Sequence, residues 1–143
     1  MTITYSDTQK ALPVDQLHHL FFSAGWTDPT LDDPDSHMYE NFNKPFINST
    51  LVISAWDGER LVGAVRVLSD KVIRSVIYDL VIDPKFQNKG IGKELIKRCI
   101  AHYPNSEWLV QTTAETAPYY QKHGFKINTD TFLTIPSLYQ NDT

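Results

Sequence analysis

The chain has 143 residues, of which 41% are hydrophobic and 21% charged, and its formal net charge is −4. This length suits one domain with a core of its own, and the acidic balance argues against nucleic acid as a main partner, because duplex-binding domains usually carry a basic face. No apolar run reaches the length of a membrane span, and the first residues lack the layout of a signal peptide. We therefore expect a single cytoplasmic domain over residues 1–143, with neither a membrane nor a nucleic acid as partner.

The first elements predicted are a short edge strand at residues 2–6 and an amphipathic helix that begins near Pro13. Apolar residues at helical spacing continue to Ala24, and Gly25 is a typical residue at the end of a helix. Trp26 follows directly, and its simplest interpretation is a residue that closes the core under the helix.

An Asp-rich loop is predicted over residues 27–35, which contain two Asp-Pro pairs. Asp35 or Ser36 is a suitable cap for a second short helix that continues to about Asn43, and Pro45 is expected to end or kink it. In one interpretation the acidic side chains of this loop attract a cationic amine. In the other they are solvated turn residues.

From residue 51 the pattern changes from helix to strand. Strands are predicted at 51–56 and 61–68, joined by Asp57-Gly58, which is a strong hairpin signal. Arg66 lies in the middle of the second strand, where a charged residue is unusual. An arginine on a solvent-facing side and an arginine paired with a substrate or a carboxylate both remain open.

A buried strand, a glycine loop and a helix follow one another without a gap. The strand is the apolar run 76–82, Asp83-Pro84 ends it, and Gly90-Ile91-Gly92 begins a segment with apolar residues at helical spacing. The first amides of a helix have no partner inside the helix, and the helix dipole favours negative charge there. Glycines also let the backbone approach a ligand closely. This stretch therefore predicts a site for an anion.

Three more elements are predicted beyond this helix. A strand at 108–112 completes a right-handed unit of strand, helix and parallel strand. A short helix over 114–122 follows, with Gly124 at its end. The segments 125–127 and 132–135 form a predicted final hairpin.

The glycine loop is neither of the two common phosphate-binding motifs. A Walker A loop needs Gly and Ser or Thr where this chain has Gln87 and Glu94, and a dinucleotide fingerprint needs a glycine at Leu95. Three segments instead resemble motifs of the GCN5-related N-acetyltransferase (GNAT) family in order and spacing: the loop Gln87-Asn88-Lys89-Gly90-Ile91-Gly92, the preceding Asp79-Leu80-Val81-Ile82-Asp83-Pro84, and the later Pro118-Tyr119-Tyr120-Gln121-Lys122-His123-Gly124-Phe125.

The resemblance implies an α/β (α+β) fold, with a mixed, mostly antiparallel central sheet flanked by helices. Its fourth and fifth strands would be parallel and splayed apart, with the pantetheine arm of acetyl-coenzyme A (acetyl-CoA) between them. The loop amides would hold the pyrophosphate, and free backbone groups of the fourth strand would pair with the pantetheine. The cofactor-binding residues implied are Leu80, Val81, Ile82, Gln87, Asn88, Lys89, Gly90, Ile91, Gly92, Lys93, Thr113 and Tyr120.

The resemblance also implies catalytic roles for two groups. The amide of Ile82 is the candidate donor to the developing oxyanion. Tyr120 is the candidate general acid for the leaving thiolate, because a phenol stays protonated at neutral pH. Tyr119 beside it is expected to pack into the core. The asparagine usual in the family before the last helix is not evident, and Thr112 or Thr113 is a possible replacement.

The general base is where the chain departs from the family pattern. Relatives often carry Glu or His where this chain has Val76 and Tyr78. Strict alternation along the strand would place Tyr78 on the side of Leu80 and Asp79 on the opposite side. We therefore expect the amine to lose its proton through a water or to arrive neutral, with Tyr78 as a third catalytic candidate that shapes the pocket or orients the water.

The resemblance makes Trp26 and Tyr78 the candidate substrate-binding residues, since the loop after the first helix borders the acceptor pocket in the family. The first hypothesis is an N-acetyltransferase that moves the acetyl group of acetyl-CoA to a primary amine of a small molecule by direct attack in a ternary complex. The alternatives are acetylation of protein lysines or N-termini, and a non-catalytic acyl-CoA-binding sensor. A homodimer is a hypothesis from the family, where dimers are common.

No metal is expected. The five histidines are scattered without metal-ligand spacing, and no cysteine pair accompanies them. The single cysteine, Cys99, lies on the apolar stripe of the helix after the glycine loop, so we expect a buried small hydrophobe rather than a nucleophile.

Overall fold

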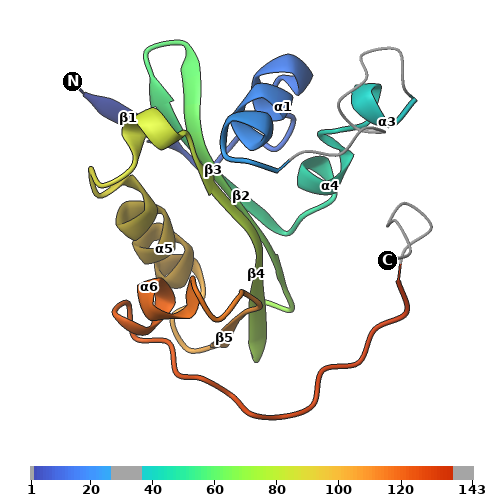
Figure 1. Cartoon of the computed structure of the whole chain (residues 1–143), viewed down its shortest axis with the longest axis vertical. Helices are drawn as coiled ribbons and strands as arrows, with labels where there is room; N and C mark the ends of the chain where they lie inside the picture. The colour runs from blue at the N-terminus through green and yellow to red at the C-terminus, as the bar shows by residue number, and fades with distance from the viewer. Residues whose placement is uncertain (1, 27–36, 137–143) are drawn as a thin grey trace. The chain divides into compact units, whose positions relative to one another are not determined.

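Five strands pair into one sheet in the order β1-β2-β3-β4-β5 in the computed structural model of the chain (Figure 1). The structure describes residues 2–26 and 37–136, which divide after Thr112 into two compact units. The sheet belongs to the first unit. Its strands are β1 (Ile3–Ser6), β2 (Leu51–Asp57), β3 (Arg60–Ser69), β4 (Arg74–Ile82) and β5 (Glu107–Val110). The first four pair antiparallel and β5 pairs parallel with β4, which confirms the predicted mixed sheet.

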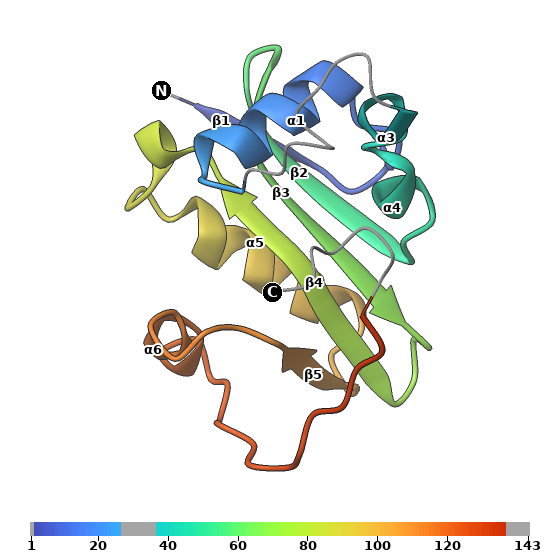
Figure 2. The same ribbon diagram turned by 45° about the vertical axis from the view of Figure 1, so that its right-hand side comes forward.

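Helices α1 (Val14–Ser23) and α5 (Ile91–His102) lie on opposite faces of the sheet, as Figure 2 shows. Both are amphipathic, as their sequence spacing predicts, because the buried residues recur about once per helical turn. On the face of α1 the core consists of Leu12, Leu17, Leu20, Phe21, Phe46, Val52, Leu61, Ala64 and Val81. Each leucine, valine or phenylalanine among them contributes about 1.5–3 kcal/mol when fully buried.

Two short helices, α3 (His37–Glu40) and α4 (Lys44–Ile47), replace the single helix expected to end near Asn43. Pro45 does not end a helix but lies in the first turn of α4. A proline fits there because the first-turn amides have no partner inside the helix. Phe46 is thereby brought into the core, where its side chain is 2% exposed. The expected start at Asp35 or Ser36 falls outside the described residues.

Close packing at Gly63 connects β3 to both ends of the segment between β4 and α5. A Cβ atom on this residue would lie 3.2 Å from Cδ1 of Ile82 and 3.3 Å from Cγ2 of Ile91. Ile82 is the last residue of β4 and Ile91 the first of α5. A Cβ at position 63 would therefore require the side chains of Ile82 and Ile91 to shift by a few tenths of an ångström.

The second unit contains one described helix, α6 (Ala117–Gln121), which is shorter than predicted. Gly124 has a positive φ of 99°, as its predicted position after the helix requires. The predicted final hairpin is wrong, because neither 125–127 nor 132–135 is a strand. An isolated hairpin of such short strands is marginal in water. The side chains of Ile127, Phe132, Leu133 and Ile135 are consequently exposed, at 67%, 64%, 85% and 97%.

None of the helices in the described ranges is long and apolar enough to cross a membrane.

The turn between β3 and β4 is organised by one carboxylate. Oδ1 of Asp70 accepts hydrogen bonds from the amides of Val72, Ile73 and Arg74, at 2.8, 2.6 and 3.1 Å. These bonds lower the pKa of Asp70 from its ordinary value, because they favour the charged form.

We predict that Asp70→Ala lowers the melting temperature at neutral pH. Since the folded-state pKa lies below the unfolded one, the contribution of the carboxylate is fully present above the unfolded pKa and is lost as the pH falls through the folded pKa. Thermal unfolding of both proteins from neutral pH to about pH 2 tests this. The difference should shrink on acidification, and a difference independent of pH would contradict the assignment.

Candidate active site

The loop after β4 is fixed at its start by Asp83, whose side chain is nearly fully buried. Its Oδ1 accepts a hydrogen bond from the amide of Lys85 at 2.9 Å, which caps the short helix η1 (Pro84–Phe86). Its Oδ2 accepts one from Nη2 of Arg60 at 2.8 Å. The Asp83-Pro84 pair, predicted to end the strand, therefore also attaches the loop to Arg60, the first residue of β3.

Gly90 is the residue at which the loop turns into α5. It has a φ of +83°, in the left-handed region that favours glycine, and it precedes the first helical residue. No side chain caps this helix end, and a Cβ on Gly90 would have no atom of the structure within 4 Å. Asn88 is also left-handed, with a φ of 62°. The amides of the first turn of α5 have no partner inside the helix and are the groups that an anion site would use.

The second half of β4 has an open edge. In the described part of the first unit, β5 pairs only with residues 74–77 of β4. The amide of Asp83 donates to the carbonyl of Val62 on β3, so alternation directs the amides of Leu80 and Ile82 away from β3, towards the open edge. The Nε2 group of Gln87 donates to the Ile82 carbonyl at 3.4 Å. The predicted splayed strand pair is therefore present, and it leaves backbone groups available to a ligand.

A bulge in β4 interrupts the alternation of side chains between the two faces of the sheet at Tyr78. Arg66 of β3 is opposite Asp79, but the next residue, Val67, is opposite Ile77, so Tyr78 is the extra residue. The guanidinium carbon of Arg66 lies 5.2 Å from the centroid of the Tyr78 ring, and Nε of Arg66 donates to Oδ2 of Asp79 at 2.5 Å. The expectation that Tyr78 and Asp79 face opposite sides is thus wrong, because both contact one side chain.

The two candidate substrate-binding residues lie at opposite ends of a row of ring contacts. Trp26 contacts Phe21, with ring centroids 5.0 Å apart, and Phe21 contacts Phe46 at 6.0 Å. The guanidinium of Arg66 lies 6.0 Å from the Phe46 ring and continues the row to Tyr78. Trp26 and Tyr78 are 48% and 52% exposed. The row therefore has a buried middle and two ends that solvent reaches.

Thr113 and Tyr120 belong to the second unit. Oγ1 of Thr113 is 2.7 Å from Oγ1 of Thr116, at the start of α6. Tyr120 is 8% exposed and contacts the rings of Tyr119 and Phe125. Tyr119, expected in the core, is instead only partly buried, and the ammonium of Lys122 lies 5.2 Å from its ring. Partial burial still raises the pKa of Tyr119.

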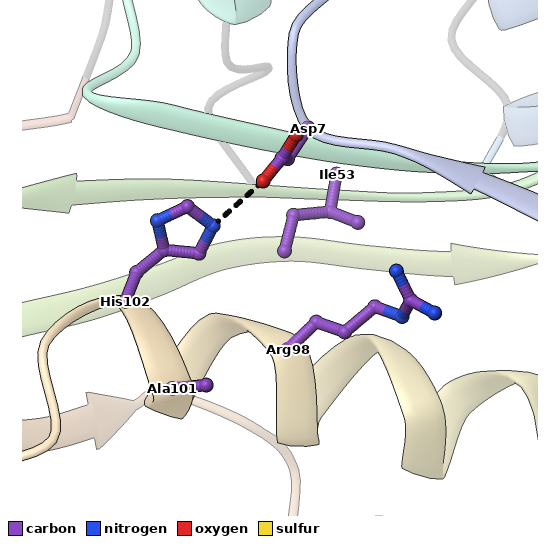
Figure 3. Close-up of a pocket in the computed structure, with 5 residues that line it drawn as sticks. All are labelled: Asp7, Ile53, Arg98, Ala101 and His102. Atoms are coloured by element: carbon purple, nitrogen blue, oxygen red, sulfur yellow. Dashed lines mark hydrogen bonds and ion pairs between the residues drawn. The ribbon is translucent and has the colours of Figure 1, made fainter.

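A separate hollow of about 230 Å³ lies between α5 and the sheet near the last turn of the helix (Figure 3). It is lined by Asp7, Ile53, Arg98, Ala101 and His102. Its polar groups already have partners: Nε2 of His102 lies 3.0 Å from Oδ2 of Asp7, and Arg98 pairs with Glu94 at 3.0 Å. We therefore assign no ligand to it. Over the described ranges, no three His, Cys, Asp or Glu side chains are grouped as metal ligands would be.

Comparison with known proteins identifies the family. The profile described as "Acetyltransferase (GNAT) domain" matches residues 28–134. An uncharacterized N-acetyltransferase ycf52-like protein of Prochlorococcus marinus is 31% identical over 91 residues, which cover 61% of this chain and 46% of that protein. The chloroplastic GCN5-related N-acetyltransferase 1 of Arabidopsis thaliana is 27% identical over 100 residues, 65% of this chain and 44% of that protein. The chain thus spans about half the length of these two relatives.

A solved structure supports the fold. The GNAT-family acetyltransferase SP0256 of Streptococcus pneumoniae superimposes with a TM-score of 0.75 at 23% identity, covering 94% of this chain and 98% of that one. The matched profile defines an acetyltransferase domain of the GNAT class, and the solved structure has the same fold. The chain belongs to the GCN5-related N-acetyltransferase family, as the match over about three quarters of its length shows.

Cys99 provides a test of the packing behind the glycine loop. Its side chain is fully buried, and this burial raises the pKa of the thiol to about 12. We predict that a water-soluble disulfide reagent leaves the native protein unmodified at neutral pH and titrates one thiol after denaturation, because the thiolate is the reacting form. Rapid native modification would show that α5 is not packed as described.

Proposed function

We propose that the chain transfers the acetyl group of acetyl-CoA to the primary amine of a small molecule by direct attack in a ternary complex. The observation that carries this proposal is the left-handed start of α5 at Gly90, in the loop that follows the half of β4 that β5 leaves uncovered in the described part of the first unit. The first amides of a helix such as α5 can bind a pyrophosphate, and a strand edge such as that of β4 can pair with an amide-containing chain. The amides proposed for the pyrophosphate and the strand edge proposed for the pantetheine therefore belong to one continuous segment.

In this proposal the cofactor-binding segment runs from Leu80 to Lys93. The amides of Ile91, Gly92 and Lys93 face the pyrophosphate, and the open edge of β4 pairs with the pantetheine. Gln87 contributes by its bond to the Ile82 carbonyl, which holds the loop against the strand end. The lysines of the loop are exposed and add positive charge rather than a fixed contact. Thr113 and Tyr120 of the second unit stay predicted cofactor-binding residues.

The reaction needs a neutral amine, a donor for the oxyanion and a proton for the leaving thiolate. The Ile82 amide would donate to the oxyanion, since alternation directs it to the open edge of β4. Tyr120 would protonate the thiolate of coenzyme A. Asp79 is a poor candidate base, because it is already paired with Arg66. We therefore assign deprotonation of the amine to a water, beside Tyr78.

In this proposal Trp26 and Tyr78, which are 48% and 52% exposed, offer aromatic surface to a small acceptor. The plain alternative is a binding protein without turnover, which the experiments below distinguish. A single domain over 1–143, a homodimer and the absence of a metal stay predictions. The cytoplasm stays the predicted location, although the chloroplastic Arabidopsis relative makes a plastid the competing one.

We predict that Gly90→Glu weakens acetyl-CoA binding at least about 10-fold in calorimetric titration, because the new carboxylate would enter the space of the pyrophosphate and the backbone would be strained. Gly25→Glu is the matched control. Gly25 has a similar φ of 90° and equally open surroundings, but it ends α1. Equal losses in both variants, or none in Gly90→Glu, would remove the loop assignment.

We predict that Tyr120→Phe lowers kcat by about 10²-fold or more, the usual effect of removing a general acid, while the Kd for acetyl-CoA changes little. Release of the coenzyme A thiol in the presence of an amine panel measures the rate. Tyr119→Phe removes a neighbouring phenol and should leave kcat nearly unchanged. If Tyr120→Phe retains full kcat, the thiolate takes its proton from elsewhere.

A further inference from the structure

We propose that Arg66 binds a carboxylate of the acceptor, so that the substrate is a small amine that also carries a carboxyl group, as amino acids do. This inference rests on the proposed acetyl transfer and specifies its acceptor. It starts from the guanidinium of Arg66, which is held by an ion pair through Nε and has N–H donors left on its terminal nitrogens.

Arg66 is fixed by three neighbours. Its Nε donates to Oδ2 of Asp79, and its guanidinium lies near the rings of Phe46 and Tyr78. A guanidinium has five N–H donors, and only one of them is used in this ion pair. Within residues 2–26 and 37–136, the structure gives the two terminal amino groups no hydrogen-bond acceptor.

The unused donors are within reach of a ligand. The side chains of Arg66 and Asp79 are 19% and 18% exposed, so the pair lies at the surface of the core rather than inside it. Neither side chain is among the buried groups of the described residues that lack a partner. Tyr78, which flanks the guanidinium, is about half exposed. A guanidinium held in plane and flanked by rings is well suited to a bidentate contact with a carboxylate.

The position of Arg66 suits a substrate group remote from the reacting amine. Its partner Asp79 lies three residues before Ile82, a separation of roughly 10 Å along a strand. The proposed oxyanion donor therefore lies about a small molecule's length along β4 from Asp79, the residue that pairs with Arg66 of β3. The amine of a short carboxylated acceptor could reach the thioester while its carboxylate contacts Arg66.

Shape makes a carboxylate a suitable partner for Arg66. A planar carboxylate offers two oxygens that match two parallel N–H groups along one edge of the guanidinium. The aminophosphonates in the test below separate this anion from a phosphate.

The competing role for Arg66 is purely structural, an ion pair that stabilises the bulge of β4. The two roles predict different kinetics. A structural role affects all acceptors alike, whereas recognition affects only acceptors with the charged group. Amines in matched sets separate them: amino acids, their carboxamides and the corresponding aminophosphonates, with kcat and KM measured for each at saturating acetyl-CoA.

We expect wild type to prefer the amino acid over its carboxamide by about 10- to 100-fold in kcat/KM, the range for a hydrogen-bonded charged pair. Arg66→Gln should abolish this preference through KM for the amino acid, and Arg66→Lys should retain part of it. Arg74→Gln is the control, because Arg74 is an exposed arginine that pairs across β4 and β5 with Glu107. Its preference should equal that of wild type.

Three results would overturn the proposal: a wild-type preference for carboxamides or phosphonates, no use of any carboxylated amine, or an equal loss for all acceptors in Arg66→Gln. If Arg66→Gln does not fold, the test rests on two other results: the wild-type ratio of kcat/KM for the amino acid and its carboxamide, and the same ratio in Arg66→Lys. Calorimetric titration with acetyl-CoA separates the two levels of inference. A protein that binds acetyl-CoA but ignores the carboxylate refutes only the role of Arg66, whereas absence of acetyl-CoA binding refutes the proposed function.

Discussion

The backbone of β4 has more hydrogen-bonding groups than the sheet satisfies. On one side β4 pairs with β3 over almost its whole length. On the other side β5 pairs only with residues 74–77 of β4. Backbone groups that the fold leaves open must pair with water or with a ligand. The remaining features of the first unit follow from this half-open strand: a bulge beside the point where pairing stops, a loop fixed to the end of the strand, and a helix that begins next to it.

The fixed and the open parts of the site are made by different means. Buried charge fixes the loop, through the contacts of Asp83 with Arg60 and with the amide of Lys85. Backbone conformation keeps the next part open, because the left-handed Gly90 starts α5 without a cap or a Cβ. The first amides of α5 are therefore held in place by the protein itself. Such preorganisation lowers the ordering cost of binding.

Much of this arrangement could be predicted from the sequence because it is encoded locally. Apolar periodicity marked β2, β3, β4 and α5, and the order of strand, Asp-Pro, glycine and helix marked the loop. The bulge at Tyr78 could not be predicted in this way, since a bulge is a property of the register between two strands. The role of Pro45 was predicted wrongly, because a proline fits both after the end of a helix and in the first turn of the next one. The final hairpin was predicted from β-propensity, which depends strongly on packing partners.

Gly63 gives the core of the first unit an influence on the loop that no ligand contact would reveal. The absent Cβ leaves room for Ile82 and Ile91, which are the two residues between which the loop is suspended. A larger residue at this buried position would have to be accommodated by those two side chains. Among homologous sequences, the same packing would restrict variation here for a steric reason. A glycine retained there would report close packing between the end of a strand and the start of a helix, not chemistry.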